Sequence, residues 1–503
     1  MALNSVLSWF VKKRIHQIEL FKKYPHEMQD EILMRIVKQA QHTEWGERYS
    51  YKDVRDPDEF RKLFPVQRYA DILPYVERMK EGRQNLLWGN EIKWYAKSSG
   101  TTSGRSKYIP VSYESLEDCH FKGGKDLLSL YFNSNPMADA HRGKTLVIGG
   151  SKTDIKNGDG SYEGDLSAII MDNLPIWVEL KRTPSLDIAL LDDWEEKLDK
   201  MARLTVSEDV RVLSGVPSWT LVLLKRILDI TGKSNIREVW PNIELFMHGG
   251  VNISPYRQQY ENLISGKMSY IESYNASEGY FGIQDQLHSD ELLLMLDYGI
   301  YYEFIPAGEW DKDHPETITL KEVELGKQYA VVISTNGGLW RYMIGDTIVF
   351  TSTTPYRIRV SGRTKHFINA FGEELIIDNA ERALEKAANE TGAVINEYTA
   401  GPIYMNEDET GAHEWLIEFE KHPMDLDKFA RVMDQELKNL NSDYDAKRTN
   451  DYTLKMPYVR TLPKGVFHSW LKLNKKLGGQ HKIPRLSNSR SFIKELNKIT
   501  EKV

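Results

Sequence analysis

Residues 98–107 read SSGTTSGRSK, a run of Ser, Thr and Gly residues that ends in Lys107. The preceding EIKWYAK at 91–97 is typical of a β-strand, and Pro110 argues against a long helix directly after the run. A loop of hydroxyl groups and unhindered backbone N–H groups that ends in a cation suits the oxygens of a polyphosphate. The sequence therefore predicts a phosphate-binding loop that follows a strand.

This loop differs from the Walker A loop, which needs the spacing G-x-x-x-x-G-K-[ST]. Gly100 and Gly104 are too close together, and Lys107 is followed by Tyr108 rather than by Ser or Thr. The alternative is a polar turn between strands, although a turn rarely needs so many Ser, Thr and Gly residues. The loop favours nucleotide-phosphate binding of another type.

The composition is that of a globular protein with more than one domain. The chain has 503 residues, 41% hydrophobic and 28% charged, and roughly two to four domains are expected at this length. The net charge is −7 and no Lys/Arg run exceeds three residues, so nucleic acid is not an expected partner. Because no window approaches 18 consecutive apolar residues, we expect no stable membrane insertion and a cytoplasmic location.

Residues 1–21 and Cys119 each have an ordinary structural interpretation. In residues 1–21 a basic cluster follows an apolar patch, the reverse of a signal peptide, so we expect an amphipathic helix on the core, with peripheral membrane contact as the alternative. Cys119 is the only cysteine and can form neither an intramolecular disulfide nor a zinc site by itself. We expect it to be a small, partly buried apolar residue on a helix.

The order of predicted elements indicates a large α/β domain and a smaller α+β domain. Strands alternate with helices at first, and a strand-rich meander follows at 292–360, which suggests an α/β core with a β-rich lobe. A helix–strand–strand–helix pattern then follows SGRTK. We predict domains at 1–361 and 362–503, the second one mobile, with a hinge near Gly362.

The motif YNASEG at 274–279 is a candidate adenine and metal site. A strand would deliver Tyr274, whose aromatic face can stack on adenine. The polar turn after it carries Asn275, Ser277 and Glu278, and a carboxylate there can hold the Mg²⁺ that accompanies ATP. The alternative is a surface turn with a solvated glutamate.

Two later motifs suit the ribose and the phosphates. In WRYMIGDTIVF at 340–350, Asp346 lies between two β-runs, and a carboxylate at a strand end can accept hydrogen bonds from both ribose hydroxyls. In GRTKHFINAFGEEL at 362–375, Arg363 lies at the domain junction, where its guanidinium could reach a phosphate or ribose. The alternatives are an ordinary turn and a basic linker.

The segment GGQHKIPRL at 478–486 places Lys482 on a loop that begins with glycines. Pro484 follows, so the segment is neither helix nor central strand. Taken alone, such a lysine would be interpreted as a solvated side chain.

In this order the motifs resemble those of the adenylate-forming superfamily, and most closely its Gretchen Hagen family of acyl acid amido synthetases, which includes auxin- and jasmonate-conjugating plant enzymes. The resemblance rests on SSGTTSG followed by KYIPVS, on ASEG, on PVQRYADILPYVERMKEG at 65–82, and on GVFHSWLKL and GGQHKIPRL near the end. It covers nearly the whole chain, whose length and closing segments look like those of a microbial branch.

The resemblance implies nucleotide contacts along two segments. The residues similar to the family's phosphate loop are Ser98, Ser99, Thr101, Thr102 and Lys107. HGGV at 248–251 falls where the family packs backbone against the adenine and the adenylate, which implicates Gly249, Gly250 and Val251. One position departs from the superfamily pattern GRxKD, because His366 replaces the acid.

The remaining motifs take individual roles by the same resemblance. Tyr274 falls at the adenine-facing aromatic residue, with Asn275 and Ser277 beside it, and Glu278 falls at the Mg²⁺ ligand. Asp346 matches the ribose-binding aspartate and Arg363 the hinge arginine. Lys482 matches the lysine that contacts the reacting phosphate and carboxylate.

The activity that the resemblance implies is an AMP-forming ligase that uses ATP and Mg²⁺. A small carboxylic acid would be adenylated with release of pyrophosphate, and the acyl group would pass to an amino acid amine. The implied catalytic residues are Lys482, Lys107 and Arg363. The alternatives are an acyl-CoA or acyl-protein ligase of the same superfamily and a non-catalytic nucleotide-binding protein.

We expect the acyl pocket between segments 210–226 and 248–275. The candidate lining residues are Val216, Trp219, Leu223 and Val251. Their branched and aromatic side chains suit an apolar or aromatic acid.

Overall fold

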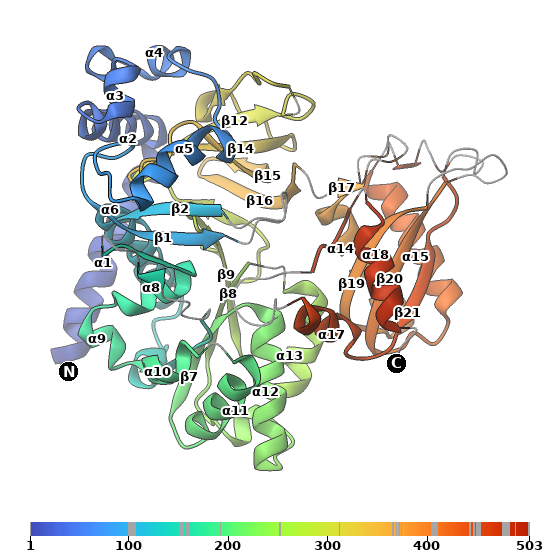
Figure 1. The fold of residues 1–503 in the computed structure, drawn as a ribbon. Helices are drawn as coiled ribbons and strands as arrows, with labels where there is room; N and C mark the ends of the chain where they lie inside the picture. The colour runs from blue at the N-terminus through green and yellow to red at the C-terminus, as the bar shows by residue number, and fades with distance from the viewer. Residues whose placement is uncertain are drawn as a thin grey trace. The chain divides into compact units, whose positions relative to one another are not determined.

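Figure 1 shows the fold in a computed structural model. The structure describes residues 2–98, 107–149, 155–156, 160–191, 193–250, 253–310, 312–364, 367–368, 370, 373, 375–403, 411–441, 444–445, 448, 454–474, 483–487 and 489–500. The chain divides into two compact units, one made of residues 1–251 and 264–360, the other of residues 252–263 and 361–503. The predicted limits 1–361 and 362–503 did not include the transfer of 252–263 to the C-terminal unit.

The first unit begins with helices. They are α1 (Ala2–Lys23), α2 (Pro25–Ala40), α3 (Glu44–Arg48), α4 (Pro57–Lys62) and α5 (Tyr69–Lys80). Pro25 starts α2 at a position where its missing N–H costs nothing, and Thr43 caps α3 by accepting a hydrogen bond from the Gly46 N–H. Ile32, Leu33 and Ile36 of α2 face the core and are buried.

A 12-stranded sheet runs through this unit in the order β13-β12-β14-β15-β16-β11-β10-β9-β8-β7-β3-β6. Its strands are β3 (Lys144–Val147), β6 (Arg182–Thr183), β7 (Val210–Gly215), β8 (Leu245–Gly249), β9 (Ser269–Ala276), β10 (Gly279–Ile283), β11 (Leu292–Leu294), β12 (Ile300–Pro306), β13 (Ile318–Thr319), β14 (Gln328–Thr335), β15 (Tyr342–Thr353) and β16 (Tyr356–Arg363).

The sheet joins the two patterns that the sequence suggested. Strands β6, β3, β7, β8 and β9 pair in parallel. The pairs β9–β10, β10–β11, β11–β16, β12–β13, β12–β14 and β14–β15 are antiparallel. The predicted α/β fold class is confirmed. The β-rich part is a continuation of the same sheet rather than a separate lobe, because the β9–β10 hairpin carries the sheet from one pattern into the other.

A second sheet of four strands carries both ends of the Gly/Ser loop. Its order is β2-β1-β5-β4, with β1 (Ile92–Ser98), β2 (Lys107–Ser112), β4 (Ile155–Lys156) and β5 (Tyr162–Gly164). The helices between strands are α6 (Tyr113–Ser115), α7 (Lys122–Ser134), α8 (Leu166–Asp172), α9 (Ile176–Glu179), α10 (Leu186–Ala189), α11 (Trp194–Thr205) and α12 (Pro217–Thr231). One large core rich in aromatic side chains connects this sheet with the 12-stranded one.

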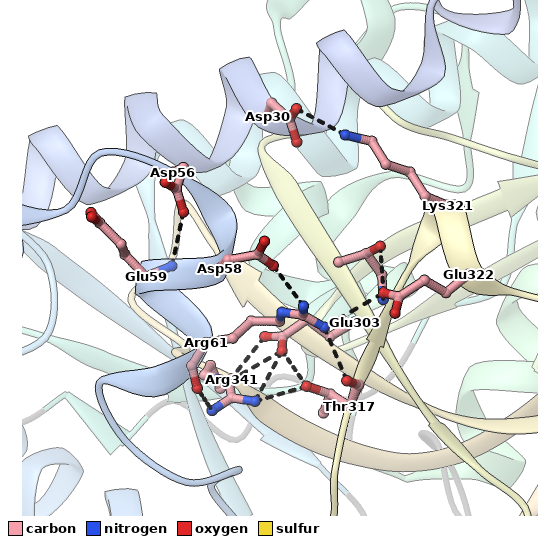
Figure 2. Close-up of polar contacts among 11 residues, drawn as sticks. Asp30, Asp56, Asp58, Glu59, Arg61, Glu303, Thr317, Lys321, Glu322 and Arg341 are labelled. Carbon is pink, nitrogen blue, oxygen red and sulfur yellow. Dashed lines mark hydrogen bonds and ion pairs between the residues drawn. The ribbon is translucent and has the colours of Figure 1, made fainter.

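A buried ion pair fixes the start of β15. The Arg341 guanidinium donates to Glu303 of β12 at 3.0 and 3.1 Å and to Thr317 Oγ1 at 2.9 Å, and the Arg341 and Glu303 side chains are 6% and 1% exposed (Figure 2). It also donates to the carbonyl oxygens of Arg61 and Phe64. Charges this deep must be paired and hydrogen-bonded, so the network ties the segment after α4 to the sheet.

The second unit has a core of its own. Strands β19 (Val394–Ile403), β20 (Ala412–Lys421) and β21 (Tyr458–Leu462) form a sheet in that order, with β17 (Phe367–Ile368) and β18 (Leu375–Ile376) as a separate pair. Its helices are α13 (Arg257–Leu263), α14 (Ile377–Thr391), α15 (Leu426–Leu440), α17 (Val466–Leu473) and α18 (Ser491–Thr500). Aromatic and aliphatic side chains from α14, α15 and the three-stranded sheet pack together.

Across the part of the chain that the structure describes, no helix combines the length and the apolar character needed to cross a membrane.

Candidate functional site

The ends of the Gly/Ser loop are held by paired strands. Ser98 and Lys107 are register partners in the antiparallel pair β1–β2, so the loop joins the ends of a hairpin. Ser99, Thr101 and Thr102 lie outside the described residues. The Lys107 side chain is half-buried, and its Nζ lies 5.7 Å from the ring centroid of Tyr69.

The glycines of HGGV mark the carboxyl end of a parallel strand. Gly249 pairs with Ser273, and a Cβ on Gly249 would lie 2.5 Å from the Ser273 carbonyl oxygen, so only glycine fits. Gly250 has φ +81°, a conformation that favours glycine. Val251 lies outside the described residues. Ligands of open α/β sheets bind beyond the carboxyl ends of parallel strands, and this turn has that position.

The YNASEG motif forms the β9–β10 hairpin. Ala276 pairs with Gly279, so Ser277 and Glu278 make its two-residue turn. Ser277 is buried, Glu278 half-buried and Asn275 exposed. The hairpin thus presents the polar residues of the motif at one end of β9, as the sequence predicted.

Tyr274 and Asp346, which are far apart in sequence, meet inside the first unit. The Tyr274 hydroxyl donates a hydrogen bond to Asp346 Oδ2 at 2.8 Å, and the residues are 8% and 7% exposed. The Tyr274 ring packs on Phe281 with centroids 4.8 Å apart. One face of the tyrosine is therefore engaged by the core, while its hydroxyl orients the carboxylate.

Asp346 lies at a bulge inside β15, not at a strand end as the sequence suggested. Ala330 pairs with Thr347 and Val332 with Met343, so residues 344–346 of β15 lie opposite the single residue Val331, and two of them are extra. Gly345 has φ +91°, which lets the strand continue through the bulge. Bulges re-aim side chains and occur beside active sites. The physical reason for the difference is that a glycine can bend a strand without ending it.

The site suits a Mg²⁺ bound together with phosphates. Within the described ranges no group of three or more His, Cys, Asp or Glu residues could hold a metal. Mg²⁺ is commonly held by one or two carboxylates plus substrate phosphates. A half-buried glutamate in a hairpin turn, Glu278, fits that ligand set.

Arg363 and Lys482 belong to the second unit. Arg363 is the last residue of β16, is half-buried, and follows Gly362, whose φ is +145°. Lys482 lies outside the described residues, but the chain directly after it is fixed on β19. There Ala400 N–H donates to the Arg485 carbonyl at 2.8 Å and Thr399 Oγ1 donates to the Pro484 carbonyl at 2.6 Å.

The residues predicted for the acyl pocket have different environments. Val216 precedes α12 and is half-buried, as is Trp219 in the first turn of that helix. Leu223 has no exposed surface, which makes it a core residue in this structure. A pocket beside α12 would therefore be lined by Val216 and Trp219 rather than by Leu223.

Cys119 is a structural residue. It lies in a π-helical turn, Leu116–Phe121, is 1% exposed, and its Sγ accepts a hydrogen bond from the Tyr280 N–H at 3.1 Å. Burial raises the pKa of the Cys119 thiol to about 12. The thiol therefore stays protonated at neutral pH and cannot act as a nucleophile.

Sequence reasoning gave no role to the side chains around Lys107. Tyr69, Lys80, Tyr108 and Glu163 surround the start of β2. The segment at 65–82 contributes to the resemblance as a whole, and no local pattern marks Tyr69 or Lys80. No local pattern marks Glu163, which reaches this place through the pairing of β5 with β1.

Models of one protein family match most of the chain. The GH3 family N-terminal domain matches residues 14–268, the central domain residues 293–363, and the C-terminal domain residues 378–491. This chain belongs to the GH3 family. The resemblance inferred from the motifs is thereby confirmed.

Curated relatives of this GH3 family member are plant enzymes. It is 22% identical to indole-3-acetic acid-amido synthetase GH3.3 of Arabidopsis thaliana, with 94% of this chain and 91% of the relative covered. It is 24% identical to the 4-substituted benzoates-glutamate ligase GH3.12 of the same plant, with 92% and 93% covered.

Two solved structures share the fold. The GH3.15 acyl acid amido synthetase matches with a TM-score of 0.78 and 18% identity, over 97% of this chain and 95% of that one. A 2-hydroxyisobutyryl-CoA ligase, in the postadenylation state in complex with 2-HIB-AMP, matches with a TM-score of 0.60 and 11% identity, over 94% and 91%. The fold is therefore that of adenylate-forming ligases.

Proposed function

We propose that this protein is an ATP-dependent acyl acid amido synthetase. It adenylates a carboxylic acid, releases pyrophosphate, and transfers the acyl group to the amine of an amino acid with release of AMP. The observation that supports this most directly is the Tyr274–Asp346 hydrogen bond of 2.8 Å, which orients a buried carboxylate in the unit whose parallel strand β8 ends at Gly249. Membership of the GH3 family supports the same reaction.

In the first half-reaction a carboxylate oxygen attacks the α-phosphorus of ATP. The new C–O–P link forms while the bond to the bridging oxygen of pyrophosphate breaks, so two anions must approach each other. Lys107 compensates the charge of the departing pyrophosphate, and Lys482 the charge of the reacting carboxylate and phosphate. Each well-placed donor of this kind contributes about 3–4 kcal/mol.

In the second half-reaction the neutral amine of an amino acid attacks the acyl carbon of the mixed anhydride. The C–N bond forms, the C–O bond to AMP breaks, and the amine loses a proton. We assign to the C-terminal unit a movement between the two steps, with 362–366 as the hinge and Arg363 on it.

Glu278 would hold the Mg²⁺ of the nucleotide. When bound, the ion neutralises phosphate charge and orients the triphosphate for in-line attack. Tyr274 holds Asp346, and that carboxylate accepts hydrogen bonds from the ribose hydroxyls. Asn275 and Ser277 lie beside the same turn and contribute polar groups to the nucleotide site.

The acid is of the apolar or aromatic class. The relatives' names specify indole-3-acetic acid and 4-substituted benzoates, and the half-buried Val216 and Trp219 offer a matching surface. A thiol acceptor is the second candidate, supported by the fold shared with a 2-hydroxyisobutyryl-CoA ligase. The proposed location is the cytoplasm, which cell fractionation tests.

Exchange of labelled pyrophosphate into ATP tests the first half-reaction. With a panel of aromatic and aliphatic acids, we expect exchange that depends on one acid class. Mass spectrometry after adding amino acids or CoA then identifies the acceptor. Absence of exchange with every acid would contradict adenylation, and a thioester without any amide would contradict the assignment of the acceptor.

Replacing Asp346 by Asn should weaken nucleotide use selectively. A hydrogen bond to a charged acceptor contributes about 1.5–3 kcal/mol, so the KM for ATP should rise about tenfold or more, while 2′-deoxy-ATP should be affected less. Asp290→Asn, at a side chain that is 71% exposed, is the matched control. Equal losses with ATP and 2′-deoxy-ATP would argue against a ribose contact.

A further inference from the structure

Tyr69, at the start of α5, contacts the last residue of the loop, Lys107, and the residue after it, Tyr108. The Tyr69 hydroxyl accepts a hydrogen bond from the Tyr108 N–H at 2.8 Å. The Lys107 ammonium lies 5.7 Å from the centroid of the same ring. Tyr69 therefore fixes the backbone directly after Lys107 and also lies beside the ammonium that this backbone carries. Figure 1 shows α5 lying along β2.

The other end of α5 makes a second attachment to the same strand. Lys80 Nζ lies 3.7 Å from the Tyr108 ring centroid and 2.8 Å from Glu163 Oε1. Glu163 is 6% exposed and lies on β5. Eleven residues are close to three helical turns, so Tyr69 and Lys80 share one face of α5. Through these two residues, that face of α5 contacts both the backbone N–H and the ring of Tyr108 on β2.

These contacts match what a pyrophosphate-binding lysine requires. A lysine has a compact charge on a flexible stem of four carbons, so its position must be imposed by neighbours. An aromatic ring attracts an ammonium group without neutralising it. Burial raises the pKa of Tyr69, so its phenol stays neutral at neutral pH and does not compete with phosphate for the ammonium.

We propose that Tyr69 is a positioning residue for Lys107, holding the ammonium at the exit of the phosphate loop in the place where the departing pyrophosphate is bound. This inference rests on the proposed function, because it assigns Lys107 to the leaving group. In this proposal Tyr69 acts through Lys107 and not by contact with substrate or nucleotide. Its contribution therefore disappears when the lysine is removed.

A double-mutant cycle in the full chain tests this coupling. The variants are Tyr69→Leu, Tyr69→Phe, Lys107→Met and the Tyr69→Leu/Lys107→Met pair, with Tyr113→Leu as control because Tyr113 is 63% exposed. The readouts are kcat and KM in pyrophosphate exchange, ATP affinity by calorimetry without acid, and the thermal midpoint.

We expect Tyr69→Leu to lower the kcat of exchange about tenfold, with little change in the KM for the acid. Tyr69→Phe keeps the ring and should recover most of that loss. In the Lys107→Met background the same Tyr69→Leu change should have an effect of about twofold or less. Tyr113→Leu should behave like the wild type.

Equal effects of Tyr69→Leu in both backgrounds would overturn the proposal, as would a Tyr69→Phe variant as impaired as Tyr69→Leu. If Tyr69→Leu does not fold, Tyr69→Met in the two backgrounds gives the same comparison, because this change also removes the ring beside Lys107. If the wild-type protein catalyses no pyrophosphate exchange with any acid, the proposed function is contradicted instead. In that case ATP affinity still decides whether the two residues are coupled.

Discussion

Lys482→Ala should lower adenylation by roughly two to three orders of magnitude while ATP binding survives. The reason is electrostatic, since the first half-reaction brings a carboxylate against a phosphate and this lysine carries the charge that compensates them. In the proposed site, ATP is bound by other groups, among them Asp346 and the phosphate loop. The measurements are pyrophosphate exchange and ATP affinity by calorimetry.

The second half-reaction separates this role from a general loss of structure. Its nucleophile is a neutral amine and its electrophile is a carbonyl carbon, so less charge must be compensated. When acyl-adenylate is supplied, Lys482→Ala should form amide at a rate much closer to that of the wild type. Lys494→Ala, at an exposed position on α18, is the matched control. An unchanged exchange rate in Lys482→Ala would refute the assigned role.

Arg341→Met should destabilise the first unit by about 3–5 kcal/mol. The change leaves the Glu303 carboxylate, which is 1% exposed, without its guanidinium partner, and it removes donors from Thr317 and from the Arg61 and Phe64 carbonyl groups. Urea unfolding followed by tryptophan fluorescence should show a lower midpoint with an unchanged slope.

Two further variants check that the cost arises from an unpaired buried charge. Arg341→Met/Glu303→Leu should be less destabilised than the sum of its single variants, because no uncompensated charge remains. Arg359→Met removes an ion pair with Asp290 whose side chains are 32% and 71% exposed, and should cost about 1 kcal/mol or less. Additive single effects, or a cost in Arg359→Met as large as in Arg341→Met, would contradict this explanation.

Local patterns in the sequence were sufficient to predict the helices and strands around the candidate site and the types of residue that these elements carry. The run at 98–107 indicated a preceding strand, a polar loop and a cation. The preceding strand is present as β1, and a second strand, β2, begins at Lys107, where the sequence argued only against a long helix. YNASEG indicated a strand followed by a polar turn, which is the β9–β10 hairpin. Such signals are readable because backbone preference and side-chain chemistry act within a few neighbouring residues.

Contacts between segments that are distant in sequence could not be predicted from local patterns. Asp346 was expected at a strand end, yet a bulge at Gly345 keeps it inside β15. Leu223 was expected in a pocket and is a core residue. Both depend on how far a strand or helix continues into the core, which its neighbours in space decide.

The sequence by itself determined the fold class, the family and the types of residue that are proposed to bind ATP, because each resides in short motifs whose order is preserved along the chain. Only the tertiary structure decided that Tyr274 holds Asp346, that Tyr69 and Lys80 brace the start of β2, and that residues 252–263 join the second unit. Those pairings join segments separated by tens of residues. They arise from the pairing order of the strands and from burial, which no short stretch of sequence encodes.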